Sequence, residues 1–210
     1  MEARKSLALI GFLIGLGALV LQFSLSIPLS LANGYSLPAA LVRFFSFYTI
    51  LTNLTLVLVY LSALTTWSWL AWFRSPITQG MMAGVMILVM VFYHLMLRNL
   101  WAPEGLFKVA DVTLHYVTPI LYALWWGLAG RSGSLRWAAV PVMLIPSLIY
   151  IAYVMIRGAI VTEYPYPILE ADKLGYGPVA INVLAVAAAL SVLFAIVTAF
   201  DTLLARRKPA

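Results

Sequence analysis

The side chains best suited to chemistry lie in one apolar stretch, residues 107–128. Asp111, His115, Thr118 and Tyr122 follow one another at steps of four, three and four residues, which puts them on one face of an α-helix. A carboxylate four residues before an imidazole can contact it, fixing the ring's tautomer and supporting a general base. The alternative is a structural hydrogen-bond network between helices. We expect a function, because an Asp at membrane depth is costly.

A second polar face is predicted in the second apolar stretch of the chain. Arg43, Ser46, Thr49 and Asn53 recur there at helical spacing. A threonine hydroxyl is a weak nucleophile unless a neighbouring base takes its proton, and His115 is the candidate base. A buried Thr often only hydrogen-bonds the carbonyl four residues earlier, which is the alternative for Thr49 taken alone. Asn53 either joins helices or orients a substrate carbonyl.

Metal and thiol chemistry are not indicated. The sequence contains no cysteine, which excludes a disulfide framework and a thiolate site. His94, His115 and Asp111 supply the two imidazoles and the carboxylate that some zinc sites use. Their spacing matches no zinc signature, so we expect no metal and no cofactor.

Composition indicates a membrane protein. Of 210 residues, 64% are hydrophobic and 10% are charged, and the mean hydropathy is +1.00. A soluble domain carries about 25% charged residues, so this chain has too few charges to cover its surface in water. A soluble enzyme, a disordered chain and a coiled coil are excluded. We interpret the net charge of +6 as cytoplasmic loops facing anionic lipid, not as nucleic-acid binding.

Six stretches are long enough to cross the membrane, which takes about 20 mostly apolar residues. They are residues 6–29, 44–64, 77–97, 107–128, 137–156 and 178–204. We therefore predict an all-α polytopic membrane protein, a six-transmembrane-helix bundle that forms a single domain over residues 1–210. The first stretch follows two basic residues, as a signal peptide does, but its apolar run exceeds the ~7–15 residues of a signal peptide. We expect it to be a retained helix.

Basic residues orient the bundle, because cytoplasmic loops carry an excess of Lys and Arg. An even number of spans leaves both termini on the same side, and cytoplasmic termini place eight basic residues inside and five outside. The eight are Arg4, Lys5, Arg74, Arg131, Arg136, Arg206, Arg207 and Lys208. We predict a multi-pass protein of the cell (inner) membrane with both termini cytoplasmic; the oligomeric state is left open.

Depth in the membrane brings the polar residues together. At ~1.5 Å of rise per residue, Thr49, His115 and His94 lie about 9, 10 and 6 Å inward of the basic residue at the outer end of their own spans. Asn182 and Arg157 are expected at a similar level. Polar residues in one layer of the outer leaflet predict a shared cavity. A transporter pathway needs polar lining through the midplane and beyond, which the apolar inner half of the spans does not offer.

Three stretches together resemble the androgen-induced membrane hydrolase family, which has six-span bacterial relatives. They are residues 47–54 (FYTILTNL), residues 111–119 (DVTLHYVTP) and residues 166–170 (YPILE). The resemblance is diffuse and extends over about residues 34–200. It implies a threonine hydrolase within the membrane that cleaves fatty acid esters of hydroxy fatty acids, with Thr49 as nucleophile and His115 as base. The animal members have an Asp three residues after the Thr, whereas Asn53 follows Thr49 by four, so Ser46 or Thr52 stays open as the nucleophile.

The predicted function is therefore hydrolysis of a lipid ester, with a membrane lipid as the partner. Thr49 would attack the ester, His115 would take its proton and Asp111 would orient His115. Asn53, His94 or Arg43 would donate hydrogen bonds to the developing oxyanion. The other residues expected to bind substrate are Ser46, Thr118, Tyr122, Arg157 and Asn182. The alternatives are a lipid-binding or transport protein that uses the same cavity, and a sensory protein with a pH-sensitive Asp–His pair.

Overall fold

The computed structural model describes residues 2–205, and in this part of the chain all regular elements are helices, joined by loops, without a strand. The first half comprises α1 (Glu2–Ala32), α2 (Leu37–Phe45), α3 (Tyr48–Leu64), η1 (Ser68–Leu70), α4 (Ala71–Arg74), α5 (Pro76–Phe92) and the π-helical turn η2 (Tyr93–Leu97). The second half comprises α6 (Gly105–Val112), η3 (Thr113–Val117), α7 (Thr118–Trp125), η4 (Trp126–Gly130), α8 (Ala139–Val161), η5 (Pro167–Leu169), α9 (Ala171–Leu174) and α10 (Tyr176–Ala205). The turns η3 and η4 are π-helical, and η1 and η5 are 3₁₀ turns.

Length and composition make four helices candidates for crossing a membrane: α1, α5 with η2, α8, and α10. The pair α2 and α3 is a fifth if it counts as one span, although the two helices meet at a bend of 74°. The structure thus confirms an all-helical chain suited to a membrane, but the predicted count of six spans is not confirmed. The predicted span at 107–128 is divided among α6, η3, α7 and η4.

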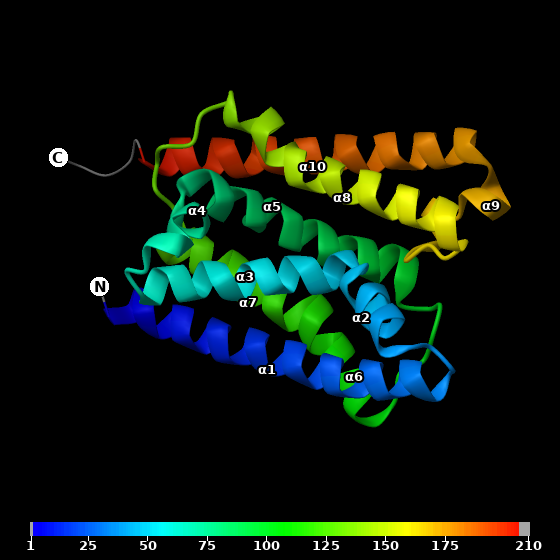
Figure 1. Ribbon diagram of the computed structural model, residues 1–210. Helices are drawn as coiled ribbons and strands as arrows, with labels where there is room; N and C mark the ends of the chain where they lie inside the picture. Colours follow the sequence, from blue (N-terminus) through cyan, green and yellow to red (C-terminus); the bar gives the residue numbers. More distant parts are fainter. Residues whose placement is uncertain (1, 206–210) are drawn as a thin grey trace.

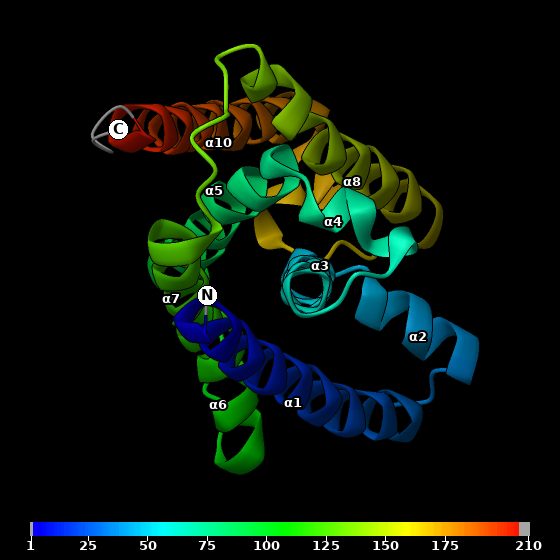
Figure 2. The same ribbon diagram turned by 90° about the vertical axis from the view of Figure 1, so that its left-hand side faces the viewer.

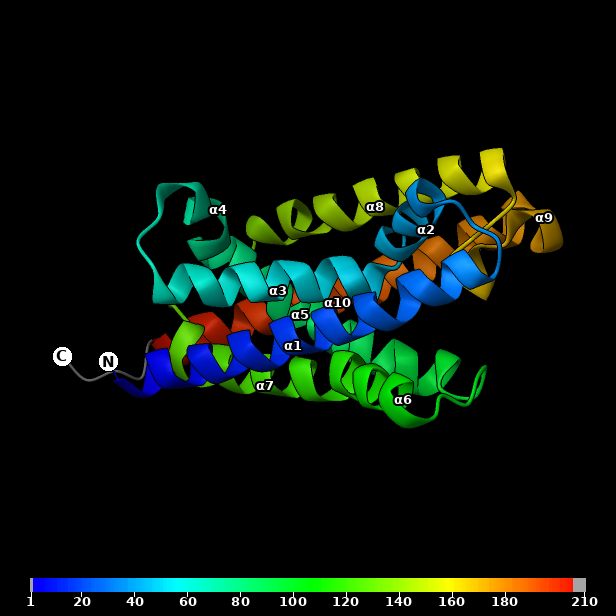
Figure 3. The same cartoon turned by 60° about the horizontal axis from the view of Figure 1, so that its bottom comes forward.

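The helices run along one another, and α3 lies in the middle of the arrangement (Figures 1 and 2). It contacts α1 and α5, while α10 joins α5 to α8. The start of α1 and the end of α10 lie at one end of the molecule, which we call the terminal end, and α2 and α9 lie at the other, the α9 end (Figure 3). Arg206, Arg207 and Lys208, which contributed to the predicted orientation, lie outside the described residues.

Close helix packing at the terminal half depends on glycine. Gly84 of α5 lies so near α10 that a Cβ there would approach the ring of Phe194 to 2.6 Å, and a Cβ on Gly11 of α1 would meet the ring of Tyr60 in α3. Small residues of this kind let helix backbones approach in lipid, where van der Waals packing drives association. A cluster of buried hydrophobic side chains surrounds these contacts, and it fixes α3 and α5 on the terminal side of the polar layer.

The polar layer begins where α2 stops and α3 starts. Ser46 ends α2 through its N–H bond to the carbonyl of Arg43, and Phe47 is extended, with φ −81° and ψ 126°. Two tyrosines satisfy the exposed backbone groups: Tyr150 donates to the Ser46 carbonyl and the Tyr48 N–H donates to the hydroxyl of Tyr166, both at 2.9 Å. The predicted helical face running from Arg43 through Ser46 to Thr49 and Asn53 is therefore wrong, because the helix is interrupted at 46–47.

Candidate functional site

Thr49 and His115 lie within hydrogen-bond distance, with 3.2 Å between Thr49 Oγ1 and His115 Nε2. Thr49 is the second residue of α3 and is buried. His115 is the central residue of η3, the π-helical turn that follows α6. The gap is that of a nucleophile and its base. The interruption of the helix at 46–47 aims Thr49 at His115 from the first turn of α3.

The other ring nitrogen of His115 is held by Asp111. Nδ1 lies 2.9 Å from the Asp111 carbonyl oxygen and 3.2 Å from its carboxylate Oδ1. Both of these atoms are acceptors, so the proton of the neutral ring sits on Nδ1. That assignment of the tautomer leaves the Nε2 lone pair facing the Thr49 hydroxyl. The structure thus places the predicted trio of Thr49, His115 and Asp111 in one chain of contacts.

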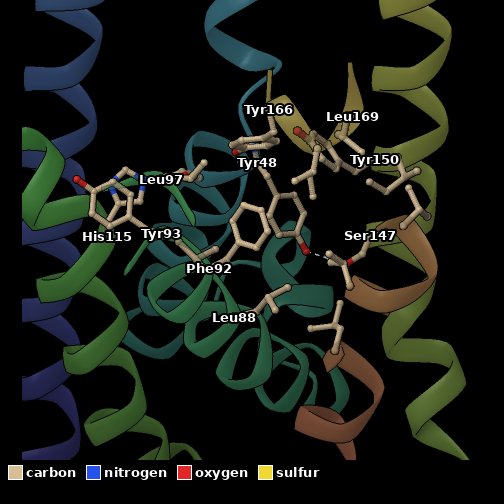
Figure 4. Close-up of a pocket in the computed structure, with 17 residues that line it drawn as sticks. Tyr48, Leu88, Phe92, Tyr93, Leu97, His115, Ser147, Tyr150, Tyr166 and Leu169 are labelled. Carbon is tan, nitrogen blue, oxygen red and sulfur yellow. Dashed lines mark hydrogen bonds between the residues drawn. The ribbon is translucent and has the colours of Figure 1, made fainter. Parts of the chain in front are cut away.

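Tyr93 completes this chain and was not singled out in the sequence. Its hydroxyl donates a hydrogen bond to Asp111 Oδ2, and its ring stacks on the imidazole of His115 at 3.9 Å between centroids and 16° between planes. Figure 4 shows the two rings side by side at one edge of the cavity. A buried carboxylate needs donors, and that need was the one signal in the sequence that pointed to a hydroxyl at this depth.

Pro119 accounts for the π-helical turn around His115. Proline has no N–H, and its ring crowds the carbonyl four residues earlier, which here belongs to His115. The N–H of Thr118 bonds to the carbonyl of Thr113, so the carbonyl of Leu114 is passed over by the helix. Such single π turns are frequent at functional sites, and this one leaves a carbonyl free to bind a neighbouring helix.

Asn53 occupies that free carbonyl. Its Nδ2 donates to Leu114 at 3.2 Å and to the Thr49 carbonyl at 2.9 Å, while its Oδ1 accepts from the hydroxyl of Thr118 at 2.6 Å. Asn53 therefore clamps the first turns of α3 to η3, holding Thr49 beside His115. With these bonds made, Asn53 is not placed to donate to an oxyanion or to a substrate carbonyl.

His94 lies apart from the pair. Its Nδ1 is 3.0 Å from the hydroxyl of Tyr116 and its Nε2 is 3.1 Å from Arg98, and the side chain is exposed. The expectation that it shares a cavity with Thr49 is wrong, because η2 turns Tyr93 inward and His94 outward. Among the described residues, no group of three or more His, Cys, Asp or Glu side chains is arranged to hold a metal ion.

The two alternative nucleophiles are engaged elsewhere. The Ser46 hydroxyl donates to the Val42 carbonyl at 2.7 Å and contacts the hydroxyl of Tyr153. The Thr52 hydroxyl donates to the Tyr48 carbonyl at 2.9 Å, the back-bonding expected of a helical Thr. Of the three candidates, Thr49 is the one in contact with the imidazole.

The remaining predicted binding residues are held by other parts of the protein. Tyr122 donates to the Gln79 carbonyl and Asn182 to the Ile168 carbonyl, both at 2.9 Å. Neither residue lines a cavity that contains the Thr49–His115 pair. Thr118 likewise lies behind the pair, bound to Asn53. The polar face predicted from Asp111 to Tyr122 therefore contains both site residues and residues that join helices, Thr118 and Tyr122.

Two cavities reach the Thr49–His115 pair. The first, of about 90 Å³, is lined mainly by apolar and aromatic side chains of α3, α5, α8 and α10 (Figure 4). The second, of about 390 Å³, lies among α1, α2, α6 and the loop before η5, and it also carries polar residues. The polar residues of the second cavity, apart from the pair itself, are Gln22, Ser26, Ser30, Arg43, Tyr93, Asp111 and Tyr166.

A loop held by an ion cluster covers this region. Glu163 accepts from Arg43 Nε at 2.5 Å and forms a second ion pair with Arg157, which also donates to the Glu163 carbonyl. Burial on its own raises the pKa of the Glu163 carboxyl, but the hydrogen bonds from Arg157 and Arg43 outweigh it and hold that pKa below its usual range. The two arginines predicted to bind substrate thus fasten the loop that carries Tyr166, although Arg43 also lines the larger cavity.

Comparisons with protein-family models, with curated proteins and with solved structures found no match to this chain. The case for a function therefore rests on the geometry of the site.

Proposed function

We propose that this protein is an intramembrane hydrolase of lipid esters, related to the androgen-induced membrane hydrolases that its sequence resembles. The observation that carries the proposal is the 3.2 Å contact of the Thr49 hydroxyl with His115, whose other nitrogen is held by Asp111. A hydroxyl, an acceptor nitrogen and an orienting carboxylate in this order are the parts of an activated oxygen nucleophile.

The reaction proceeds in two halves. Thr49 Oγ1 attacks the ester carbonyl while His115 Nε2 takes its proton, and the same proton passes to the departing alcohol as the acyl-threonine forms. Water then attacks the acyl-threonine while His115 Nε2 takes a proton from the water. The bond from Thr49 Oγ1 to the acyl carbon breaks, His115 returns that proton to Thr49 Oγ1, and the fatty acid leaves as product. Asp111 holds the imidazole in one tautomer throughout and stabilises its protonated form.

The cavities support a substrate with two apolar arms, such as a fatty acid ester of a hydroxy fatty acid. The first carbons of one arm fit the small apolar cavity between α5, α8 and α10, and the other arm enters the larger cavity beside α1 and α2. The ester group then lies at the Thr49–His115 pair, which both cavities share. Lipid reaches such a site from the membrane, because the helices present apolar side chains outward.

We further propose that the protein spans the inner membrane six times with the α9 end extracytoplasmic. The α2–α3 pair then counts as one span. The continuous helical run Gly105–Gly130, with its π turns, is the span that completes the six, the fourth along the chain. The exposed tryptophans near η1 and α4, Trp67, Trp69 and Trp72, lie at the terminal end and match an interfacial belt on the cytoplasmic side.

A fluorophosphonate probe tests the proposed nucleophile. We expect the probe to label the wild-type protein at Thr49 and the wild type to hydrolyse long-chain esters, with both signals lost in Thr49→Ala and His115→Ala. Thr55→Ala is the matched control, because the Thr55 hydroxyl bonds only its own helix at Leu51, and it should keep both. Lipid bound without turnover in the wild type, or labelling that persists in Thr49→Ala, would contradict the proposal.

A further inference from the structure

The two cavities meet at a small group of residues, which we call the junction. Five residues line both cavities: Thr49, Tyr93, Leu97, His115 and Tyr166. On the proposed function, an ester with one arm in each cavity must place its carbonyl at the junction. When Thr49 attacks, the carbonyl oxygen gains negative charge, and stabilising that charge takes hydrogen-bond donors already in position.

Most of the polar hydrogens at the junction are committed to other acceptors. The Tyr93 hydroxyl donates to Asp111, and the His115 Nδ1 proton faces the Asp111 carbonyl. The Thr49 hydroxyl has its acceptor in His115 Nε2, and Leu97 has no polar side-chain atom. The side chain left to serve the oxyanion is Tyr166.

The hydroxyl of Tyr166 is prepared to donate. Its oxygen accepts the Tyr48 N–H at 2.9 Å, and a hydroxyl that accepts one hydrogen bond keeps its own proton free and is polarised as a donor. Burial raises the pKa of Tyr166, although the hydrogen bond from the Tyr48 N–H opposes the rise. The phenol thus carries its proton at neutral pH. Figure 4 shows Tyr166 beside Tyr48, with the rings of Tyr93 and His115 lower and to the left.

The backbone at this point favours negative charge as well. Thr49 lies in the first turn of α3, a helix of 17 residues. The N–H groups of Tyr48, Ile50 and Leu51 in this turn already bond the Tyr166 hydroxyl and the Phe47 carbonyl, so the backbone contributes through the positive end of the helix dipole. A tetrahedral oxyanion formed on Thr49 lies next to that positive end.

We propose that Tyr166 is a catalytic residue whose hydroxyl donates a hydrogen bond to the oxyanion formed when Thr49 attacks the ester. The bond from Thr49 Oγ1 to the carbonyl carbon forms, the carbonyl π electrons move onto oxygen, and the Thr49 proton moves to His115. Tyr166 keeps its proton. As the carbonyl re-forms, the bond to the alcohol oxygen breaks and His115 returns the proton to that oxygen. This inference rests on the proposed function and replaces Asn53, His94 and Arg43 as the expected donors.

Tyr166→Phe tests the proposal, with Tyr153→Phe as the matched control. Tyr153 of α8 lines neither cavity, and its hydroxyl contacts the Ser46 hydroxyl at 2.9 Å. With p-nitrophenyl decanoate as substrate, we expect Tyr166→Phe to lower kcat by about 10²–10³-fold, the cost of one lost oxyanion donor, with little change in KM. Tyr153→Phe should leave kcat nearly unchanged.

Binding measurements separate an oxyanion role from packing. A long-chain trifluoromethyl ketone adds to Thr49 and forms an oxyanion, so its affinity should fall in Tyr166→Phe by about the same factor as kcat. An ether analogue of the ester has no such oxygen and should bind equally well to both proteins. Equal losses for the ketone and the ether, or a kcat within threefold of wild type, would overturn the role of Tyr166 and leave the hydrolase proposal intact.

A second variant avoids dependence on how well Tyr166→Phe folds. Difluorotyrosine at position 166 keeps the ring and the hydroxyl but ionises at lower pH. We expect the alkaline limb of the kcat profile to move to lower pH, because an ionised phenol cannot donate. An unmoved limb would count against the proposal. Absence of turnover in the wild type, by contrast, would overturn the hydrolase proposal itself and the role of Tyr166 with it.

Discussion

Two buried aspartates at opposite ends of the molecule show how differently this fold uses a carboxylate. Asp111 is 4% exposed and Asp201 is 0% exposed. Asp201 accepts three backbone N–H groups, those of Ser132, Gly133 and Leu135, each at 3.0 Å. Asp111 has Tyr93 and His115 as its side-chain partners.

The partners decide what each carboxylate can do. Backbone amides are fixed donors, so the Asp201 side chain holds the loop before α8 against α10 and has no mobile proton beside it. Asp111 contacts an imidazole that can gain and lose a proton, and that imidazole faces a hydroxyl and two cavities. Burial of a charge is therefore a structural device at the terminal end and a chemical one at the α9 end.

The largest effect expected from this contrast is that of Asp111→Asn on turnover. The amide leaves the shape of the site intact but no longer favours the protonated ring, and it can donate to Nδ1 and reverse the tautomer. We expect kcat to fall by about 10³-fold or more, as losses of an orienting carboxylate do in other hydrolases, with only a modest drop in the thermal midpoint. A kcat within tenfold of wild type would show that Asp111 serves packing, as Asp201 does.

The next effect is that of Asn53→Ala, which removes the clamp between α3 and η3. The Leu114 carbonyl and the Thr118 hydroxyl then lose a partner, and we expect a loss of about 1–3 kcal/mol in unfolding free energy. Because Thr49 is no longer held against His115, kcat should fall by about tenfold or more, a cost typical of misplacement. Thr55→Ala is the control, and unchanged kcat in Asn53→Ala would separate the clamp from the chemistry.

The sequence predicted the two sides of this comparison unequally. Asp111, His115 and Thr118 were found because helical spacing of four and three residues is visible within one segment. Asp201 was missed, since its partners are backbone amides of a loop 66–69 residues away, and amide groups leave no mark on a sequence.

Helical periodicity also could not predict how the segment that carries Thr49 meets the segment that carries His115. Nothing in the residues around Phe47 signals an interruption, because no Pro or Gly stands there; tyrosines from α8 and the following loop satisfy the broken backbone instead. Depth correctly placed Thr49 and His115 at one level, but it put His94 there as well. Depth gives the height of a residue along its helix but not the direction of its side chain. The π-helical turn η2 sets that direction for His94.

Asp201→Asn should reverse the pattern of Asp111→Asn. One oxygen becomes an NH₂ group that faces the N–H of Leu135 in a buried site, which we expect to cost about 1.5–3 kcal/mol of unfolding free energy. The Thr49–His115 pair lies at the other end, so kcat of the folded protein should stay within twofold of wild type. Thermal unfolding in detergent and ester turnover measured on the same preparation check both halves. A large loss of kcat would mean that the two ends are coupled.

The smallest effect concerns the third carboxylate, Glu163, which two arginines hold at the surface of the α9 end. The pKa of Glu163 is lowered in the folded protein. Its ion pairs therefore stabilise the loop fully at pH values above the ordinary pKa of Glu, and this stabilisation is lost as the pH falls through the lowered pKa. Because Glu163 stays ionised from pH 8 to pH 5, we expect its titration to leave wild-type kcat unchanged over that range. We expect Glu163→Gln to lower kcat by about twofold to fivefold at every pH in the range, because the loop then holds Tyr166 less firmly. Salt should weaken the wild type towards the variant, because these side chains are partly exposed. A Glu163→Gln protein with the kcat and salt response of the wild type would show that the loop is held by Tyr150 and Tyr166 packing alone.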